Sequence, residues 1–254
     1  KIIQDLPQVI NNFSGTVDYI QKFKNDFTFS AGGNYNKTKT DNDTKNYAYP
    51  YDLSGNQLAS QNDFNHFIYN ENIYGLYVTI EKKFSDKFSG KIGARYEITN
   101  SLGTADSWKN NVETNQQIER NYNNLLPYLS FNYAINDKNN LSYSFSSRMR
   151  RPSFWELNPV KNLITEDNYT QNNPFVKASS TYNQELTYMY KNSYFLILNH
   201  TYEKDQITQV PLQRSYIDPK TNQKRVQLAY IRTNFGDKQE MSAMLGIQKS
   251  LFKQ

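Results

Sequence analysis

The chain has 254 residues, enough for one large domain or two smaller ones, with a formal net charge of +5 and a pI of about 9.0. Cysteine is absent, which excludes disulfides, thiolate metal sites and cysteine nucleophiles. The basic residues form only short runs, so the charge gives little support for binding nucleic acid, and none is expected as a partner.

Tyrosine and phenylalanine dominate the apolar residues of a chain that is otherwise hydrophilic. Aromatic residues make up 15% of the sequence, whereas the mean hydropathy is −0.84. A disordered chain is poor in aromatic residues. The combination favours an all-β protein with wet loops and a polar second face. Residues 1–10 lack the apolar run of a signal peptide, so for an exported protein we expect this to be a mature or truncated form.

Apolar and polar residues alternate with a period of two, which predicts β-strands rather than amphipathic helices. In the clearest example, Leu76, Val78 and Ile80 share one face. Thr79 and Glu81 share the other. Nine strands are predicted on this basis, at 12–23, 26–36, 71–84, 87–100, 122–135, 139–149, 181–191, 193–213 and 224–252.

The connections between these strands alternate between short and long. Short turns are expected at 24–25, 85–86, 136–138 and 191–192, and long connections at 37–70, 101–121, 150–180 and 214–223. Short periplasmic turns and long extracellular loops distinguish the two ends of outer-membrane barrels. A strand of about 12 residues, tilted by about 45°, also crosses roughly 28 Å, close to the thickness of the apolar band. The sequence therefore predicts an antiparallel transmembrane β-barrel segment of about nine or ten long, meandering strands.

The number of strands bears on whether the barrel is complete. A complete single-chain bacterial barrel has an even number of strands and keeps both termini in the periplasm. Counting 224–252 as one strand gives an odd total, and counting it as two strands joined at 236–238 places both termini outside. We therefore expect residues 1–254 to form one partial barrel region, with strands missing at least on the N-terminal side.

Two stretches resemble a known family. The stretch 71–97, ENIYGLYVTIEKKFSDKFSGKIGARYE, resembles the β-barrel of TonB-dependent receptors, in particular the Bacteroidetes-type outer-membrane β-barrel family. Its ending matches the family's G-x-R-Y-E at Gly93, Arg95, Tyr96 and Glu97. The stretch 141–159, LSYSFSSRMRRPSFWELNP, is similar to the family signature S-x-R-x-x-R-P-S-(aromatic)-x-x-L-N-P and is the most specific of the matches.

Two shorter elements extend the resemblance. Asn173-Pro174 and the following Glu185 resemble an N-P-x-L-K-P-E…E-L element, although Ala178 and Ser179 stand where the family has a second proline. The run 233–236 resembles an N-x-G element that opens a long descending strand, which favours 224–252 as one strand.

The resemblance implies a barrel of about 22 strands plugged by an N-terminal domain, with the plug and the segment that contacts TonB outside this chain. It implies a receptor and transporter in the bacterial outer membrane that takes up a scarce nutrient. The implied partners are membrane lipid, the TonB system and a small-molecule or glycan ligand, without a cofactor.

An arginine cluster followed by aromatic residues is the predicted ligand contact. Guanidinium groups match carboxylates and phosphates, and aromatic rings stack on sugars or catechols. The predicted contact residues are Arg148, Arg150, Arg151, Phe154 and Trp155, with Trp108 and Tyr169. In the alternative interpretation, the arginines pin a strand end and its loop inside the barrel through charge pairs with Glu81, Glu97 or Glu185.

Catalysis and metal binding find no support in the sequence. His66 and His200 have no spacing typical of a metal site, and no nucleophile motif or phosphate-binding glycine loop occurs, so no enzyme is expected. The main alternative to a transporter is a soluble or surface-exposed β-rich binding or adhesion module, which would fold alone as a monomer without detergent. An outer-membrane enzyme built on a barrel is the third alternative.

Overall fold

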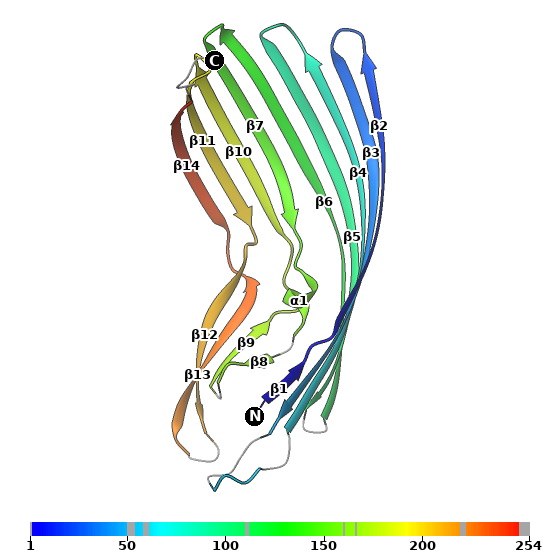
Figure 1. Cartoon of the computed structure of the whole chain (residues 1–254), viewed down its shortest axis with the longest axis vertical. Helices are drawn as coiled ribbons and strands as arrows, with labels where there is room; N and C mark the ends of the chain where they lie inside the picture. The colour runs from blue at the N-terminus through cyan, green and yellow to red at the C-terminus, as the bar shows by residue number, and fades with distance from the viewer. Residues whose placement is uncertain are drawn as a thin grey trace, which may run out of the picture.

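The computed structural model describes residues 2–49, 54–57, 61–109, 112–159, 161–165, 167–218 and 222–248. These residues form a tall, curved wall of antiparallel strands that does not close on itself (Figure 1). The strand order is β1-β3-β4-β5-β6-β7-β10-β11-β14, and β2 also pairs with β3. The wall consists of β1 (Ile2–Asp5), β2 (Gln8–Phe23), β3 (Phe27–Ala48), β4 (Gln61–Lys83), β5 (Phe88–Lys109), β6 (Val112–Asn136), β7 (Asn139–Arg150), β10 (Ser179–Tyr190), β11 (Tyr194–Lys204) and β14 (Lys238–Ile247).

The predicted alternation is confirmed by the register of the strands. Leu76 of β4 lies opposite Tyr96 of β5, which lies opposite Leu125 of β6, and all three side chains are exposed on the outer face. The neighbouring row, Tyr77 and Arg95, faces inward. Because neighbouring residues of a strand point to opposite faces, the wall has an apolar outer face and a polar inner face.

Two rows of aromatic side chains border the apolar outer face. Four strands carry an aromatic pair eight residues apart, namely Phe27 and Tyr35, Phe88 and Tyr96, Tyr182 and Tyr190, and Tyr194 and Tyr202. Eight residues at about 3.3 Å each, tilted by about 45°, span roughly 19 Å, which fits within the apolar band of an outer-membrane barrel. Among the described residues, no helix is long and apolar enough to span a bilayer.

The first two expected long connections are wrong, because most of their residues continue the strands. β3 runs on to Ala48 and pairs with β4 from Gln61, and β5 and β6 pair out to Lys109 and Val112. These extensions form the lower part of the wall in Figure 1, opposite the short turns. Beyond the aromatic rows an apolar outer face is no longer required, so apolar and polar residues need not alternate regularly, although the backbone still pairs. The sequence therefore shows no alternation with a period of two here, and the backbone pairing could not be predicted from it.

The last two predicted strands are also wrong as single strands. A break at 205–206 separates β11 from β12 (Ile207–Ile217), and a break at 235–237 separates β14 from β13 (Lys224–Asn234). The breaks lie opposite each other, with positive φ at Asp205 (55°) and Gly236 (67°). They turn the β12–β13 hairpin out of the wall into a small sheet with β9 (Asn168–Asn172) and β8 (Lys161–Leu163).

The connection from β7 to β10 folds against the inner face of the wall. It contains one short helix, α1 (Phe154–Leu157), followed by β8 and β9. Leu157 packs with Phe67 and Tyr69 of β4 and Ala105 of β5 in a buried cluster, and Phe154 packs against it. This apolar contact holds the connection, residues 151–178, inside the extended end of the wall, where it positions the arginine cluster.

Candidate ligand-binding site

Glu156 of α1 is the most buried acid among the described residues of the connection, with 1% of its surface exposed. Its Oε2 accepts hydrogen bonds from the backbone N–H of Ser153 (2.9 Å) and from the Ser153 hydroxyl (3.0 Å). Its Oε1 accepts from Nη2 of Arg150 (2.7 Å) and from Nη1 of Arg232 (3.2 Å). One carboxylate therefore joins the end of β7, α1 and the β12–β13 hairpin.

Trp155 lies at the surface of the same junction. The guanidinium of Arg232 is 4.7 Å from the centre of the Trp155 ring, within the range of a cation–π contact. The backbone carbonyl of Trp155 accepts a hydrogen bond from Nδ2 of Asn172, at 2.5 Å. Trp155 remains 47% exposed.

A second carboxylate, Glu97 of β5, fixes the start of the connection to the wall. Its Oε1 accepts from Nε of Arg95 at 2.5 Å, and its Oε2 accepts from Arg151. Nε of Arg151 also lies 3.2 Å from the Thr99 hydroxyl. Further along, Arg120 of β6 donates to the backbone carbonyls at 174 and 176. The connection is thus tied to β5 and β6 by charged groups as well as by the apolar cluster.

The charge state of Glu156 makes this junction sensitive to acid. Burial alone would raise the pKa of Glu156, but hydrogen bonds from Ser153 and the Arg150 guanidinium outweigh it and hold the pKa below its usual range. A pKa lowered by folding stabilises the folded state above the unfolded value of about 4.3, and this stabilisation is lost as the pH falls through the folded pKa. We therefore expect the connection to loosen below about pH 4.

Hydrogen–deuterium exchange of the full-length protein checks this expectation. Backbone amides of residues 151–178 should exchange faster at pH 3.5 than at pH 6, after correction for the intrinsic rate. Amides in the middle of β4 and β5 serve as the control and should keep their protection. Equal protection of the connection at both pH values would contradict the assigned role of Glu156.

The structure brings together four of the seven predicted contact residues. Arg150, Arg151, Phe154 and Trp155 meet at the junction described above. Arg148 faces inward next to them on β7, opposite Thr181. It is exposed and has no ion-pair partner among the described residues.

The other two predicted residues lie apart. Tyr169 is on β9, opposite Ala229 of β13. Trp108 lies near the far end of β5, on the outward side of the wall, opposite Phe64. Trp108 is therefore not brought together with the arginines, because residues of even number on β5 face away from the interior.

The pinning interpretation is confirmed for one of its three expected pairs. Arg151 does bind Glu97, whereas Glu81 lies 3.7 Å from Lys91, and Glu185 accepts from the hydroxyl of Thr187. Glu156 and Arg232 were missed. Glu156 lies inside the signature stretch, three residues after Ser153, so the sequence itself could have indicated it as a site residue. Nothing in the local sequence indicated Arg232, since a sequence distance of 76 residues separates it from Glu156.

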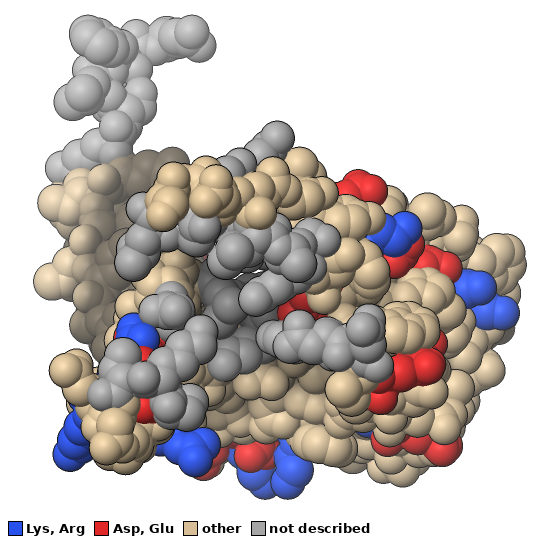
Figure 2. All heavy atoms as spheres, turned by 90° about the horizontal axis from the view of Figure 1, so that it is seen from below, with Lys and Arg blue, Asp and Glu red and all other residues tan. Residues whose placement is uncertain are grey.

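Charge is mixed around the extended end of the wall. Seen from that end, Figure 2 shows acidic and basic side chains interspersed over the visible rim, without a large patch of one sign. Among the described residues, no group of three potential metal ligands occurs.

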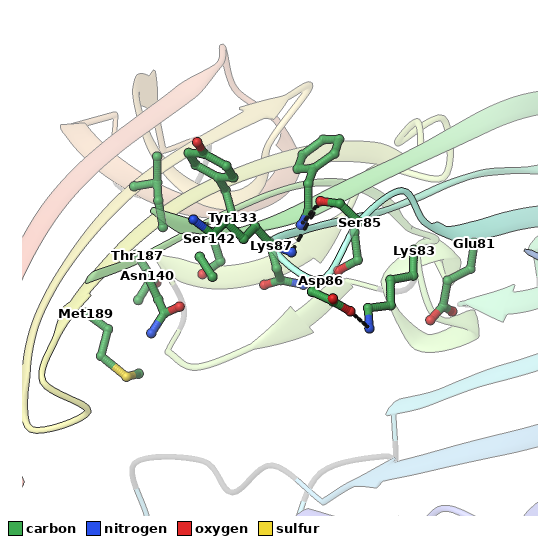
Figure 3. Close-up of a pocket in the computed structure, with 15 residues that line it drawn as sticks. Glu81, Lys83, Ser85, Asp86, Lys87, Tyr133, Asn140, Ser142, Thr187 and Met189 are labelled. Atoms are coloured by element: carbon green, nitrogen blue, oxygen red, sulfur yellow. Dashed lines mark hydrogen bonds and ion pairs between the residues drawn. The ribbon is translucent and has the colours of Figure 1, made fainter. Parts of the chain in front are cut away.

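The opposite end of the wall has a hollow of about 540 Å³ beside the short turns (Figure 3). Its lining comes from β4 to β7 and β10 and includes Glu81, Ser142 and Thr187. At its edge Nζ of Lys83 binds Oδ1 of Asp86 at 2.7 Å. The inward-facing side chains Glu81, Ser142 and Thr187 of this hollow are polar, as expected for the lumen of a barrel.

Two solved structures have a similar fold. The ferric yersiniabactin uptake receptor FyuA from Yersinia pestis is 14% identical to this chain, with a TM-score of 0.60. The aligned region covers 96% of this chain and 33% of the FyuA chain. The copper transporter OprC is 13% identical to this chain, with a TM-score of 0.62. The aligned region covers 98% of this chain and 37% of the OprC chain. The chain thus spans about a third of the length of these proteins, and at this identity the likeness establishes the fold. No curated protein matches.

The family assignment comes from the sequence as a whole. Residues 2–254 match the model of the outer membrane protein beta-barrel family, which covers nearly the entire chain. The match agrees with the apolar outer face, the aromatic rows and the open antiparallel wall, and it confirms the expected resemblance to outer-membrane receptor barrels. The chain therefore belongs to the outer membrane protein beta-barrel family, and its place is the bacterial outer membrane.

Proposed function

We propose that this chain forms part of the barrel wall of a TonB-dependent receptor that takes up a scarce nutrient. The wall would separate the lipid from a polar passage. A plug domain outside this chain would close the passage, and the TonB system would open it through that plug. The proposal assigns no catalytic step to the chain. The family match and the likeness to an uptake receptor and a transporter support transport over a soluble binding or adhesion module.

The observation that carries the proposal is the folded connection at the extended end of the wall. It lies against the inner face beside the end of β7, where Arg148 and Arg150 face inward, and it carries Trp155, which is partly exposed. Arg150 is paired with Glu156, whereas Arg148 has no ion-pair partner among the described residues. A guanidinium binds a carboxylate, a phosphate or an anionic chelate, and the indole stacks on a planar ring or a sugar. The fitting ligands are therefore anionic siderophore-like chelates and acidic glycans.

Arg148 provides the sharpest test, because it has no ion-pair partner among the described residues to lose. Arg148→Ala in the full-length protein should weaken ligand binding about tenfold or more, since a hydrogen bond to a charged group contributes roughly 1.5–3 kcal/mol. Calorimetry with a panel of ferric siderophores and acidic oligosaccharides measures the effect. Protein stability should stay within about 1 kcal/mol of the wild type.

Lys37→Ala is the matched control, because Lys37 lies on the outward face of β3 opposite Phe13. It removes one cation without altering the interior. If both variants bind like the wild type, the arginine cluster is structural only. If both weaken binding equally, the effect comes from net charge and not from the proposed contact.

A further inference from the structure

Arg150 is a predicted ligand contact that is already paired with an acid. Its Nη2 lies 2.7 Å from Oε1 of Glu156, yet 45% of its side chain is exposed, which leaves it within reach of an anionic ligand. A ligand that binds this guanidinium draws it away from Glu156. Because a buried charge without a partner is strongly unfavourable, Arg150 can bind a ligand at low cost only if Glu156 keeps another cation.

Arg232 of β13 is that other cation. Its Nη1 lies 3.2 Å from the same Oε1 of Glu156, and only 27% of its side chain is exposed. Oε2 of Glu156 accepts from the backbone N–H and the hydroxyl of Ser153. If Arg150 turns to a ligand, Glu156 therefore keeps three of these four hydrogen bonds and one of its two ion pairs. A carboxylate that is 1% exposed could not draw the same support from water.

The net charge of the junction favours the same exchange. Arg150 and Arg232 share one carboxylate, so two guanidinium groups and one acid leave a net charge of +1. An anionic ligand on Arg150 neutralises this excess. Without Arg232 the remaining pair would be neutral, and an anion bound to Arg150 would meet the negative charge of Glu156 without compensation.

Arg232 also fixes the ring of Trp155. Its guanidinium is 4.7 Å from the centre of that ring, and the carbonyl of Trp155 accepts from Nδ2 of Asn172, the residue opposite Arg232 in the parallel pair of β9 and β13. The backbone N–H of Asn173 donates to the carbonyl of Arg232 at 3.0 Å. The backbone of β9 thus sets the position of Arg232, whose side chain orients both the buried carboxylate and the indole.

We propose that Arg232 is a positioning residue of the ligand-contact site. It keeps Glu156 ion-paired when Arg150 leaves the carboxylate to bind an anionic ligand, and it holds Trp155 beside that ligand. Binding therefore transfers Glu156 to Arg232 and links the site to the β12–β13 hairpin. The inference rests on the proposed ligand contact, and it differs from a purely structural role of Arg232 in the junction.

Sulfate is the probe, because a small oxyanion fits a guanidinium and stays charged at neutral pH. The full-length protein is labelled with 5-fluorotryptophan in lipid nanodiscs, and the ¹⁹F resonance of Trp155 is assigned by its loss in Trp155→Phe. Titration with sulfate at constant ionic strength gives Kd from this resonance. Arg232→Gln should weaken binding about tenfold or more, because Arg150 must then leave a carboxylate that has no other cation.

Removal of the competing carboxylate separates positioning from a structural role. The double variant Glu156→Gln/Arg232→Gln should bind sulfate at least as tightly as the wild type, because Arg150 is no longer held by an acid. Loss of a purely structural contact would not be repaired by removing its partner as well. Glu156→Gln alone should also bind at least as tightly, and this single variant keeps the test open if Arg232→Gln fails to fold.

Two controls keep or remove a cation on the same hairpin. Arg232→Lys retains the charge beside Glu156 and should keep Kd within about threefold of the wild type. Arg214→Gln removes an exposed cation of β12, opposite Gln227, and should change neither Kd nor the Trp155 resonance. An equal loss of affinity in Arg214→Gln and Arg232→Gln would assign the effect to net charge and overturn the proposal.

The titrations distinguish failure of the inference from failure of the ligand contact. If the Trp155 resonance of the wild type does not respond to sulfate, the proposed contact is wrong and the inference falls with it. If the wild type responds and Arg232→Gln binds equally well, the inference alone is wrong. If Arg232→Gln weakens binding and the added Glu156→Gln does not restore it, Arg232 has a structural role only.

Discussion

Replacing Ile92 with arginine is expected to lower the free energy of unfolding of the inserted barrel by about 2–4 kcal/mol. Ile92 lies on β5, four residues from Phe88 and four from Tyr96, so it stands midway between the two aromatic rows. Its side chain is 57% exposed on the apolar face. An arginine there would place its charge at the centre of the hydrocarbon. Urea unfolding of the full-length protein in lipid vesicles, followed by its heat-modifiable migration, measures the loss.

Ser144→Arg is the matched control for this charge. Ser144 lies on the inner face of β7, opposite Glu185 of β10, so an arginine there meets water and an acid. We expect its effect on the free energy of unfolding to stay within about 1 kcal/mol. Similar losses for Ile92→Arg and Ser144→Arg would mean that both faces have the same surroundings, against the assignment of the outer face to lipid.

Glu156→Ala is expected to destabilise the folded connection by about 2–4 kcal/mol. The substitution leaves the guanidinium groups of Arg150 and Arg232 without their shared carboxylate. It also removes two hydrogen bonds to Ser153. Breaking a buried pair by removing one partner costs more than the pair contributes, although Arg150 stays partly solvated and limits the loss. Hydrogen–deuterium exchange over residues 151–178 should increase accordingly.

An exposed acid provides the comparison for Glu156. Glu240 of β14 binds Lys238 at 2.6 Å, and its side chain is 60% exposed. Glu240→Ala should change stability by less than about 1 kcal/mol, because solvent screens such a pair. If Glu156→Ala leaves the exchange of the connection unchanged, the apolar cluster around Leu157 holds the connection alone and the carboxylate is dispensable.

The membrane-crossing part of the fold could be predicted because lipid enforces the pattern. Leu76, Val78 and Ile80 must face hydrocarbon, while Thr79 and Glu81 face the interior. Because neighbouring residues of a strand point to opposite faces, apolar and polar residues alternate in the sequence with a period of two. Beyond the aromatic rows the requirement ends. Residues 37–48 and 61–70 read as loops for that reason, although they pair as regular strands.

The breaks in the last two strands and the charge junction could not be predicted for a different reason. Asp205 takes a positive φ of 55°, which is uncommon for a residue other than glycine, so only Gly236 hinted at a turn. Both breaks are fixed by contacts between distant segments, such as the bond from Nδ2 of Asn234 to the carbonyl of Asp205 at 2.7 Å. Arg232 meets Glu156 only because this hairpin leaves the wall.

The assignment of the two faces is tested most directly by cysteine labelling. The chain has no cysteine, so single cysteines can be placed at 76, 78 and 80 on the outer face and at 77, 79 and 81 on the inner face of β4, in a cysteine-free full-length protein. A membrane-impermeant maleimide should label the inner-face positions and leave the outer-face positions unlabelled until the membrane is dissolved in denaturant. Equal labelling of both sets in intact membranes would contradict a barrel wall with one face in lipid.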